Sequence, residues 1–201
     1  MKIGLLGITG GVGERFAKLA LARGHTIIAL ARTPSKVKIP ANPKLVVIKG
    51  DSTSLEAISD FAASVDVVVC CVGQPPRAST HIMEKTVANI LEAKPQRVIY
   101  ISSLGLCGSS PLIRYVLLPI AGSANIRDGE RADDLCRNAS CPWTCVRPAG
   151  LADTAGKGAY LATEATGASF SPISRDDVAL FLADEVEGCK YDRQAVQLYA
   201  A

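Results

Sequence analysis

Three glycines near the N-terminus, Gly7, Gly10 and Gly13, have the residue type and the spacing to bind a phosphate. They follow the apolar run of residues 3–6 and lead at once into an amphipathic stretch, so we expect a strand, a tight turn and a helix start. Glycines let the backbone turn sharply and approach a ligand closely. The free N–H groups at a helix start, helped by the helix dipole, attract an anion such as the pyrophosphate of a dinucleotide.

The spacing of these glycines is G-x-x-G-x-x-G, whereas the dehydrogenase fingerprint is G-x-G-x-x-G. Glycines at this spacing also arise by chance in a chain that contains 17 of them. The spacing alone is therefore a weak signal. Its position between a strand and a helix favours a nucleotide site, because the motif requires that context.

The next predicted strand ends at Ala31 and is followed by Arg32, Thr33, Ser35 and Lys36. A site selective for NAD uses an Asp or Glu here to accept hydrogen bonds from the ribose hydroxyls, and none stands between Gly24 and Ile48. A guanidinium suits a 2′-phosphate through bidentate, charge-assisted bonds. We therefore predict that Arg32 selects NADPH over NADH. The alternative is that Arg32 and Lys36 belong to a solvated loop.

Two further strand ends carry candidate cofactor residues. Asp51 and Ser52 follow the third strand, where a carboxylate can reach an adenine amino group or can cap the next helix. Gly73 follows the fourth strand, where it can let the backbone approach a ribose or can serve as a turn before a proline loop. Both alternatives stay open.

Hydroxyl groups follow the fifth strand at Ser102 and Ser103. They are candidates for polarising a carbonyl or positioning a substrate, and the alternative is helix capping or a local hydroxyl turn. Tyr115 comes 13 residues after Ser102 and is the candidate proton donor. The sixth strand leads into Pro148, Ala149 and Gly150, a turn that could close over the nicotinamide carboxamide.

Histidine and cysteine give weaker signals. His25 is expected at the surface, in a turn at the far end of the sheet, and His81 could face the cleft as a proton donor. The seven cysteines lie mostly in apolar runs, as buried free thiols of a reducing compartment do. No histidine stands at a zinc-like distance from them, so no metal site is expected.

Alternating strand-like and helical patterns must position these residues. The expected strands are residues 2–6, 26–31, 45–48, 66–72, 97–101, 144–147 and 194–199, and the expected helices are residues 12–23, 54–64, 80–93, 128–138 and 175–187. This alternation predicts an α/β, three-layer fold with a mainly parallel sheet and helices on both faces. Ligands of such sheets bind at the carboxyl ends of the strands, which is where the candidate residues fall.

The bulk properties are those of one ordinary globular domain. A length of 201 residues, 48% hydrophobic residues and a net charge of +3 predict a single domain spanning the whole chain. Basic residues form no stripe and few aromatic residues interleave with them, so nucleic acid is not an expected partner. No apolar run reaches the length of a membrane helix and no cleavage site follows the N-terminal stretch, so we expect a cytoplasmic protein.

Seven segments taken together resemble one family. They are the glycine turn, Ala31-Arg32, Gly50-Asp51, the run ending in Gly73, and residues 98–105, 143–151 and 173–179. These segments resemble the atypical short-chain dehydrogenase/reductases, in particular the small NAD(P)H-binding proteins that include biliverdin-IX-beta (flavin) reductase and the NmrA-like proteins. The resemblance covers nearly the whole chain. It implies a Rossmann fold with NADP in the cleft.

The resemblance also implies which residues bind the cofactor. The pyrophosphate residues would be Gly7, Thr9, Gly10, Val12 and Gly13, with Gly11 beside them. Arg32 would take the 2′-phosphate, and Asp51 and Ser52 would flank the adenine. The ribose and nicotinamide would lie near Val72, Gly73, Ser102, Pro148, Ala149 and Gly150.

One departure from the family pattern concerns the proton relay. Ser102 and Tyr115 keep the serine–tyrosine spacing of orthodox members, but Pro119 stands where a lysine is expected. That lysine helps to lower the pKa of the tyrosine. We expect an NADPH-dependent reductase, either monomeric or homodimeric, that acts on a small flavin-like, quinone or carbonyl acceptor. The alternatives are a non-catalytic NADP-binding redox sensor and, more weakly, a sugar epimerase.

Overall fold

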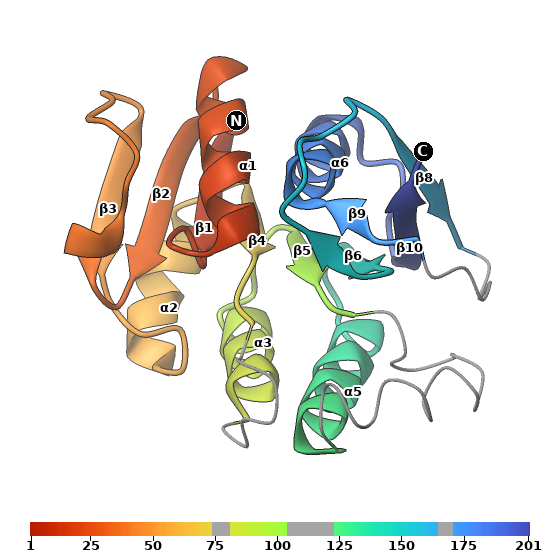
Figure 1. The fold of residues 1–201 in the computed structure, drawn as a ribbon. Coiled ribbons are helices and arrows are strands. Elements are labelled where there is room, and N and C mark those ends of the chain that lie inside the picture. The colour runs from red at the N-terminus through yellow and green to blue at the C-terminus, as the bar shows by residue number, and fades with distance from the viewer. Residues whose placement is uncertain (74–80, 104–122, 165–170) are drawn as a thin grey trace.

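The protein is described by a computed structural model that covers residues 1–73, 81–103, 123–164 and 171–201. An eight-stranded sheet with the order β3-β2-β1-β4-β5-β6-β10-β8 forms its centre (Figure 1). The strands are β1 Lys2–Leu6, β2 Thr26–Ala31, β3 Leu45–Lys49, β4 Val67–Cys70, β5 Val98–Ile101, β6 Trp143–Pro148, β8 Tyr160–Thr163 and β10 Gln194–Ala200. All neighbouring pairs are parallel except β8 and β10, which are antiparallel.

Helices cover both faces of this sheet. Helices α1 (Gly11–Ala22) and α6 (Arg175–Gly188) pack together on one face, and α2 (Leu55–Ala63), α3 (Ile82–Glu92) and α5 (Ser123–Arg137) lie on the other (Figure 1). A short 3-10 turn, η1 (Pro34–Lys36), follows β2. The strand order reverses between β1 and β4, which is the switch point where open parallel sheets bind ligands. The predicted three-layer Rossmann fold is confirmed.

Alternation along the strands builds a core on each face of the sheet. In β1, Ile3 and Leu5 pack beneath α1 and α6, whereas Leu6 packs beneath the opposite helices. All four residues of β4 are buried, because a strand covered on both faces places every side chain in a core. Coverage on both faces therefore accounts for the uninterrupted apolar run of residues 67–70.

Helix ends follow local chemistry. The chain leaves α1 through Gly24, whose φ of 87° is a left-handed conformation that glycine adopts without strain. The amide of His25 then donates to the carbonyl of Ala20 at 3.0 Å, which closes the helix end. At the N-terminal ends of α2 and α6, the hydroxyl groups of Ser54 and Ser174 cap the helices. They accept hydrogen bonds from the amides of Ala57 and Asp177. These caps fix where the helices that frame the candidate site begin.

Some expectations about the fold were wrong. The sequence did not indicate β7 (Leu151–Ala152), β9 (Ile173–Ser174) or β8, because two-residue strands and a half-exposed edge strand carry no clear periodicity. The expected helix of residues 128–138 begins earlier, at Ser123, and the expected strand of residues 66–72 is shorter. Strands β7 and β9 form a separate two-stranded sheet beside the main one.

His25 is not at the surface but only 9% exposed, and this corrects the prediction. Its Nε2 lies 2.8 Å from Glu187 Oε1 and its Nδ1 lies 3.3 Å from the N-terminal amine. The C-terminal part of α6 covers a turn that seemed open in the sequence. Among the six described cysteines, all are free thiols, but Cys189 is exposed. None of the helices in the described ranges combines the length and the apolar character needed to cross a bilayer.

Candidate cofactor site

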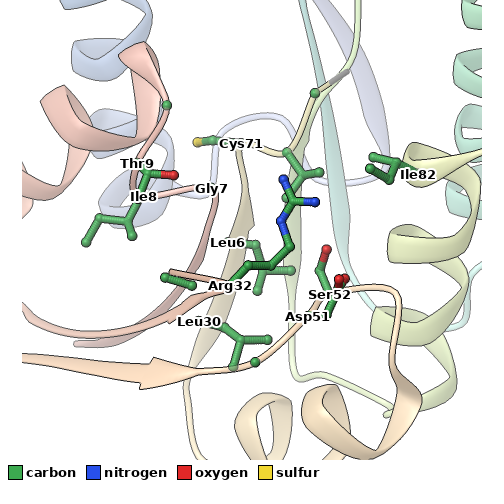
Figure 2. A pocket seen from close by; sticks show the side chains of 15 residues that line it. Leu6, Gly7, Ile8, Thr9, Leu30, Arg32, Asp51, Ser52, Cys71 and Ile82 are labelled. Atoms are coloured by element: carbon green, nitrogen blue, oxygen red, sulfur yellow. The ribbon is translucent and has the colours of Figure 1, made fainter. Parts of the chain in front are cut away.

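A cleft of about 170 Å³ lies at the carboxyl ends of β1, β2, β3 and β4, at the switch point of the sheet (Figure 2). Its walls come from the turn after β1, the end of β2, the loop after β3 and the segment after β4. Eight predicted cofactor residues line it together: Gly7, Thr9, Gly10, Arg32, Asp51, Ser52, Val72 and Gly73. Leu6, Ile8, Leu30, Ala31, Gly50, Cys71 and Ile82 complete the lining.

Close backbone packing explains two glycines of the first turn. Gly7 has a φ of 85°, and a Cβ there would lie 2.6 Å from the carbonyl oxygen of Cys71. A Cβ on Gly13 would collide with the carbonyl oxygen of Gly7. The amide of Gly10 donates to that same carbonyl at 2.9 Å and closes the turn. Gly7 and Gly13 therefore shape the turn and bring α1 close to β1.

The start of α1 offers donors to an anion. Gly10 occupies the N-cap position and has no side chain to accept from the first N–H groups, which find no partner within a helix. Val12 is buried in the core, so only its backbone can serve a ligand. The Thr9 side chain lies on the cleft side of the turn in Figure 2. This cradle of amides fits a diphosphate.

Arg32 extends from the end of β2 across the cleft, toward the side that carries Ser52 (Figure 2). The side chain is exposed, and no carboxylate among the described residues forms an ion pair with it. Its positive charge contributes to a lowered pKa of Asp51, after the larger effect of a hydrogen bond from the Thr53 amide. Arg32 thus places an unpaired guanidinium in the cleft.

Asp51 lines the cleft and also holds a turn. Its Oδ1 accepts from the Thr53 amide at 2.9 Å and from the Thr53 hydroxyl at 2.8 Å. The N-cap residue of α2 is Ser54, so Asp51 does not cap this helix. Asp51 instead stabilises the turn that precedes it. Ser52 Oγ lies 2.9 Å from Thr86 Oγ1 of α3, which fixes this wall of the cleft to the next helix.

Gly73 has no packing reason to be a glycine. A Cβ there would meet nothing within 4 Å, in contrast to Gly7 and Gly13. The open space on the cleft wall leaves room for a ligand to approach the backbone.

Ser102 stands at the end of β5, and its amide donates to the Val146 carbonyl at 2.7 Å. The residue is 8% exposed, and its hydroxyl has no hydrogen-bond partner within the described ranges. The hydroxyl of Tyr100, two residues earlier, is also buried, and no described residue forms a hydrogen bond with it. Burial raises the pKa of Tyr100 well above its usual value, and the nearby Ser102 side chain opposes part of that rise. Ser103 is exposed. Tyr115, the third predicted catalytic residue, lies outside the described residues.

The residues predicted near the nicotinamide do not line the cleft itself. Pro148 ends β6, and Ala149 and Gly150 follow, with Ala149 N donating to the Leu198 carbonyl at 2.9 Å. Neighbouring strands lie about 4.8 Å apart, so the end of β6 is about 10 Å from the end of β4 along the same edge. An extended dinucleotide can span that distance. The structure therefore places Ser102 and these three residues beside the cleft, without a contact that tests their role.

Beneath this part of the edge lies a buried ion pair that the sequence did not reveal. Arg147 NH2 and Asp133 Oδ2 are 2.7 Å apart, and both residues are almost fully buried. Cys145 Sγ donates to the other carboxylate oxygen of Asp133 at 3.4 Å. The pair joins α5 to β6 and keeps these two elements in register below Pro148. Its only signal in the sequence is that Arg147 falls inside an apolar stretch, whereas Asp133 stands among charged residues.

His81 belongs to a cluster of polar side chains at the start of α3. It precedes α3 with a left-handed φ of 50°, and its Nδ1 lies 3.3 Å from Glu84 Oε2. Arg131 donates to the same carboxylate oxygen at 3.1 Å. Asp128, close by, accepts from the amides of Met83 and Glu84. These contacts fasten the start of α3 to α5, and they leave the predicted role of His81 as a proton donor untested.

The fold and the cleft together define a protein of the dinucleotide-binding Rossmann class. Comparison with known proteins assigns the family: residues 7–188 match the NAD(P)H-binding family, and the chain belongs to it. This confirms the resemblance that the sequence motifs indicated.

Individual relatives are distant. An uncharacterized protein, YwnB, of Bacillus subtilis (strain 168) is 28% identical over 207 residues, covering 93% of this chain and 92% of the relative. The structure of ChuY, an anaerobillin reductase from Escherichia coli O157:H7, has a TM-score of 0.81 at 20% identity, with 99% of this chain and 97% of that one covered. A wide-type short-chain dehydrogenase/reductase from Veillonella parvula DSM 2008, in complex with NADP, has a TM-score of 0.80 at 16% identity, with 98% and 94% covered.

Proposed function

We propose that this protein is an NADPH-dependent reductase that passes hydride to a small, flat and partly apolar acceptor, namely a flavin-like molecule, a quinone or a carbonyl compound. Membership of the NAD(P)H-binding family and the cleft at the switch point support the proposal. The observation that carries it is the pairing of an anion-binding helix start with the unpaired guanidinium of Arg32 across one cleft.

Arg32 accounts for the choice of NADPH. A guanidinium binds a phosphate through two parallel charge-assisted bonds, and the ribose hydroxyl of NADH offers no such partner. No acidic residue follows β2 to repel the phosphate or to accept from that hydroxyl. Asp51 and Ser52 then flank the adenine, while Val72 and Gly73 face the ribose.

Ser102 positions the reacting groups. When bound, the cofactor supplies the hydride, and the protein supplies orientation and electrostatics. A buried hydroxyl without a partner is costly unless a ligand completes its hydrogen bond, so Ser102 is suited to hold the nicotinamide carboxamide or a carbonyl of the acceptor. Ser103 and Tyr115 complete the proposed catalytic set, with Tyr115 or a water as the proton source. Pro148, Ala149 and Gly150 frame the nicotinamide.

The remaining proposals concern the context of the protein. We infer one Rossmann domain over residues 1–201, acting as a monomer or homodimer in the cytoplasm on a small-molecule substrate. Neither nucleic acid nor a membrane is a proposed partner.

Turnover against a panel of acceptors tests this function. The oxidation of NADPH is followed in the near-ultraviolet band of the reduced nicotinamide with flavins, quinones and aldehydes, and NADH serves as the matched cofactor control. We expect turnover with at least one class and a clear preference for NADPH. Tight NADPH binding without turnover by any acceptor would instead identify a redox sensor, the alternative favoured by Pro119 at the expected lysine position. Absence of both binding and turnover would refute the proposal.

A further inference from the structure

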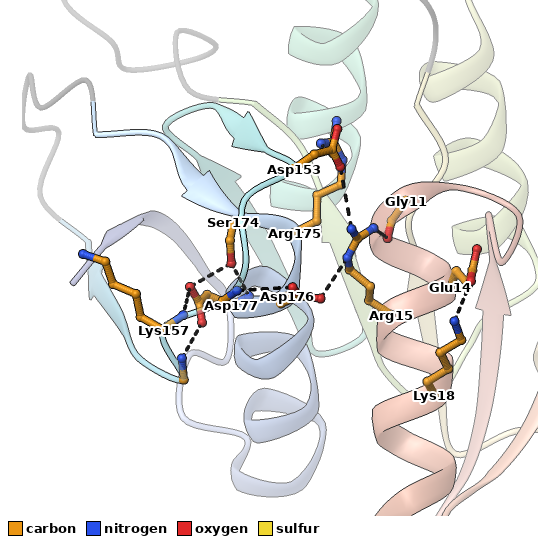
Figure 3. A network of polar contacts seen from close by, with 12 residues as sticks. Gly11, Glu14, Arg15, Lys18, Asp153, Lys157, Ser174, Arg175, Asp176 and Asp177 are labelled. Carbon is orange, nitrogen blue, oxygen red and sulfur yellow. Dashed lines mark hydrogen bonds and ion pairs between the residues drawn. The ribbon is translucent and has the colours of Figure 1, made fainter.

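Two guanidinium groups flank the first residue of α1 (Figure 3). Arg15 donates from NH1 to the Gly11 carbonyl at 2.9 Å and from Nε to Asp176 Oδ1 at 2.8 Å. Arg175, the first residue of α6, pairs through NH1 with Asp153 Oδ1 at 2.7 Å. Arg15 NH2 lies 3.7 Å from that same oxygen. Asp153 therefore holds two arginines from two helices at once.

The stem of Arg175 lies directly over Gly11. A Cβ on Gly11 would come within 2.7 Å of Arg175 Cδ and 3.0 Å of its Nε. Gly11 is the glycine that the G-x-x-G-x-x-G spacing does not require, and a Cβ there would force the Arg175 side chain to shift. Gly11 directly follows Gly10, which lines the cleft. The guanidinium of Arg175 is thus positioned beside the cradle of amides that suits a diphosphate.

Asp153 is a weak partner for this guanidinium. Its side chain is 74% exposed, and exposed ion pairs contribute little and are screened by salt. The chain that follows is fastened to α6, because Asp177 accepts from the amides of Lys157 and Gly158 at 3.0 and 2.9 Å. Asp153 is therefore kept close to Arg175 without being buried against it. The diphosphate, with one negative charge on each of its two phosphates, offers Arg175 stronger bidentate bonds than this carboxylate does.

We propose that Arg175 binds the cofactor diphosphate and that Asp153 occupies its guanidinium when the cofactor is absent. The inference rests on the proposed function, since it assigns a further ligand to the same cofactor. Binding exchanges one partner of Arg175 for another: the diphosphate displaces the Asp153 carboxylate, while Asp176 continues to hold Arg15 against α6.

The same pair of helices supplies a matched control at its opposite end. Arg23 also bridges α1 to α6, through Asp184 at 2.8 Å and Glu187 at 3.0 Å, but it follows the last turn of α1, far from the cleft. An effect of losing a bridge between the two helices would appear in Arg23→Gln and Arg175→Gln alike. An effect on the diphosphate would appear in Arg175→Gln alone.

The test is a fluorescence or calorimetric titration of NADPH and of adenosine 2′-monophosphate, which lacks the diphosphate, into each variant. We expect Arg175→Gln to weaken NADPH binding by about tenfold or more, because a charge-assisted bond is lost. Adenosine 2′-monophosphate should bind Arg175→Gln and the parent protein equally. Arg175→Lys should restore part of the NADPH affinity, and Arg23→Gln should leave it unchanged.

Asp153→Asn provides the second arm. We expect it to strengthen NADPH binding several-fold in the parent protein and to have no effect in the Arg175→Gln background, because Asp153 acts through that guanidinium. Equal NADPH affinity of Arg175→Gln and the parent, or a loss shared by adenosine 2′-monophosphate, would overturn the inference while leaving the proposed function intact. If the parent protein itself fails to bind NADPH, the proposed function fails and the inference fails with it.

Discussion

Arg97, at the amino ends of the strands, and Arg32, at the carboxyl ends, differ in how the protein pairs their charges. At the amino end, Arg97 is buried and donates to Glu185 Oε1 at 2.7 Å and to the Glu185 carbonyl at 2.9 Å. Glu185 also accepts from the Thr144 hydroxyl and from the amides of Lys190 and Tyr191. At the carboxyl end, neither Arg32 nor the Ser102 hydroxyl has a partner among the residues that the structure describes.

This difference separates structural from functional polar groups. A buried charge that is paired within the protein holds elements together, as the Arg97–Glu185 pair does for β5, β6 and α6. A polar group left without a protein partner at the edge where ligands bind is available to a ligand. Removing the paired charge of Glu185 should therefore alter stability, and removing Arg32 or the Ser102 hydroxyl should alter binding or turnover.

The largest expected effect is at the amino end. Glu185→Gln leaves the buried Arg97 charge uncompensated and should lower the free energy of unfolding by about 3–5 kcal/mol. Glu187→Gln, which affects a half-exposed carboxylate of the same helix, should cost at most about 1 kcal/mol. Urea denaturation measures both. Equal losses in the two variants would contradict the distinction between the buried cluster and the exposed one.

Two glycines near the carboxyl ends of the strands, Gly13 and Gly73, should differ in the stability that is lost on substitution by alanine. Gly13→Ala forces a Cβ against the Gly7 carbonyl and should cost about 1–3 kcal/mol of stability through overpacking. Gly73→Ala meets open space, so stability should stay within about 1 kcal/mol of the parent.

The Gly73→Ala variant should nevertheless lose about tenfold in NADPH affinity, equivalent to about 1.4 kcal/mol, because the added methyl group stands on the cleft wall. Thermal unfolding and a NADPH titration on the same samples separate the two effects. Undiminished NADPH affinity in Gly73→Ala would remove Gly73 from the cofactor site.

Ser102→Ala should change turnover more than stability. The hydroxyl has no partner to lose, so the free energy of unfolding should move by no more than about 1 kcal/mol. With an active acceptor, kcat should fall by about tenfold or more, since a misplacement of the reacting groups by about 1 Å can cost about 100-fold. A variant that is destabilised but fully active would show that the hydroxyl serves the fold.

The smallest expected effect concerns pH. The pKa of Asp51 is lowered, chiefly by the hydrogen bond from the Thr53 amide. A carboxyl with a depressed pKa in the folded state adds stability above its unfolded pKa, and this contribution disappears as the pH falls through the folded value. Asp51→Asn should therefore reduce the pH dependence of unfolding only in the acid range, below about pH 4. An identical acid profile for parent and variant would contradict this role.

Much of the framework was predictable because its signals are local. The glycine turn and the alternation of strands and helices follow from apolar periodicity and turn chemistry over a few residues. The sequence after β2 likewise predicted a phosphate-binding Arg32, because no Asp or Glu stands between Gly24 and Ile48. These features do not depend on knowing which distant segments meet.

The features that escaped prediction depend on distant contacts. His25 is buried because Glu187, far along the chain, closes over it, and a turn motif cannot reveal such a cover. The two-residue strands β7 and β9 exist only because each pairs with the other. Gly11 was counted with the cofactor residues from its position in the turn, but only the structure shows Arg175 lying across it.

The most direct test of the central claim is the cofactor preference of Arg32→Ala. NADPH and NADH are titrated into parent and variant protein while unfolding temperatures are recorded. The account predicts that Arg32→Ala loses about 1.5–3 kcal/mol of NADPH binding energy, roughly 10- to 100-fold in Kd. NADH affinity and the unfolding temperature should stay unchanged. An equal loss for both cofactors, or undiminished NADPH binding, would contradict the claim that this cleft holds a 2′-phosphorylated dinucleotide.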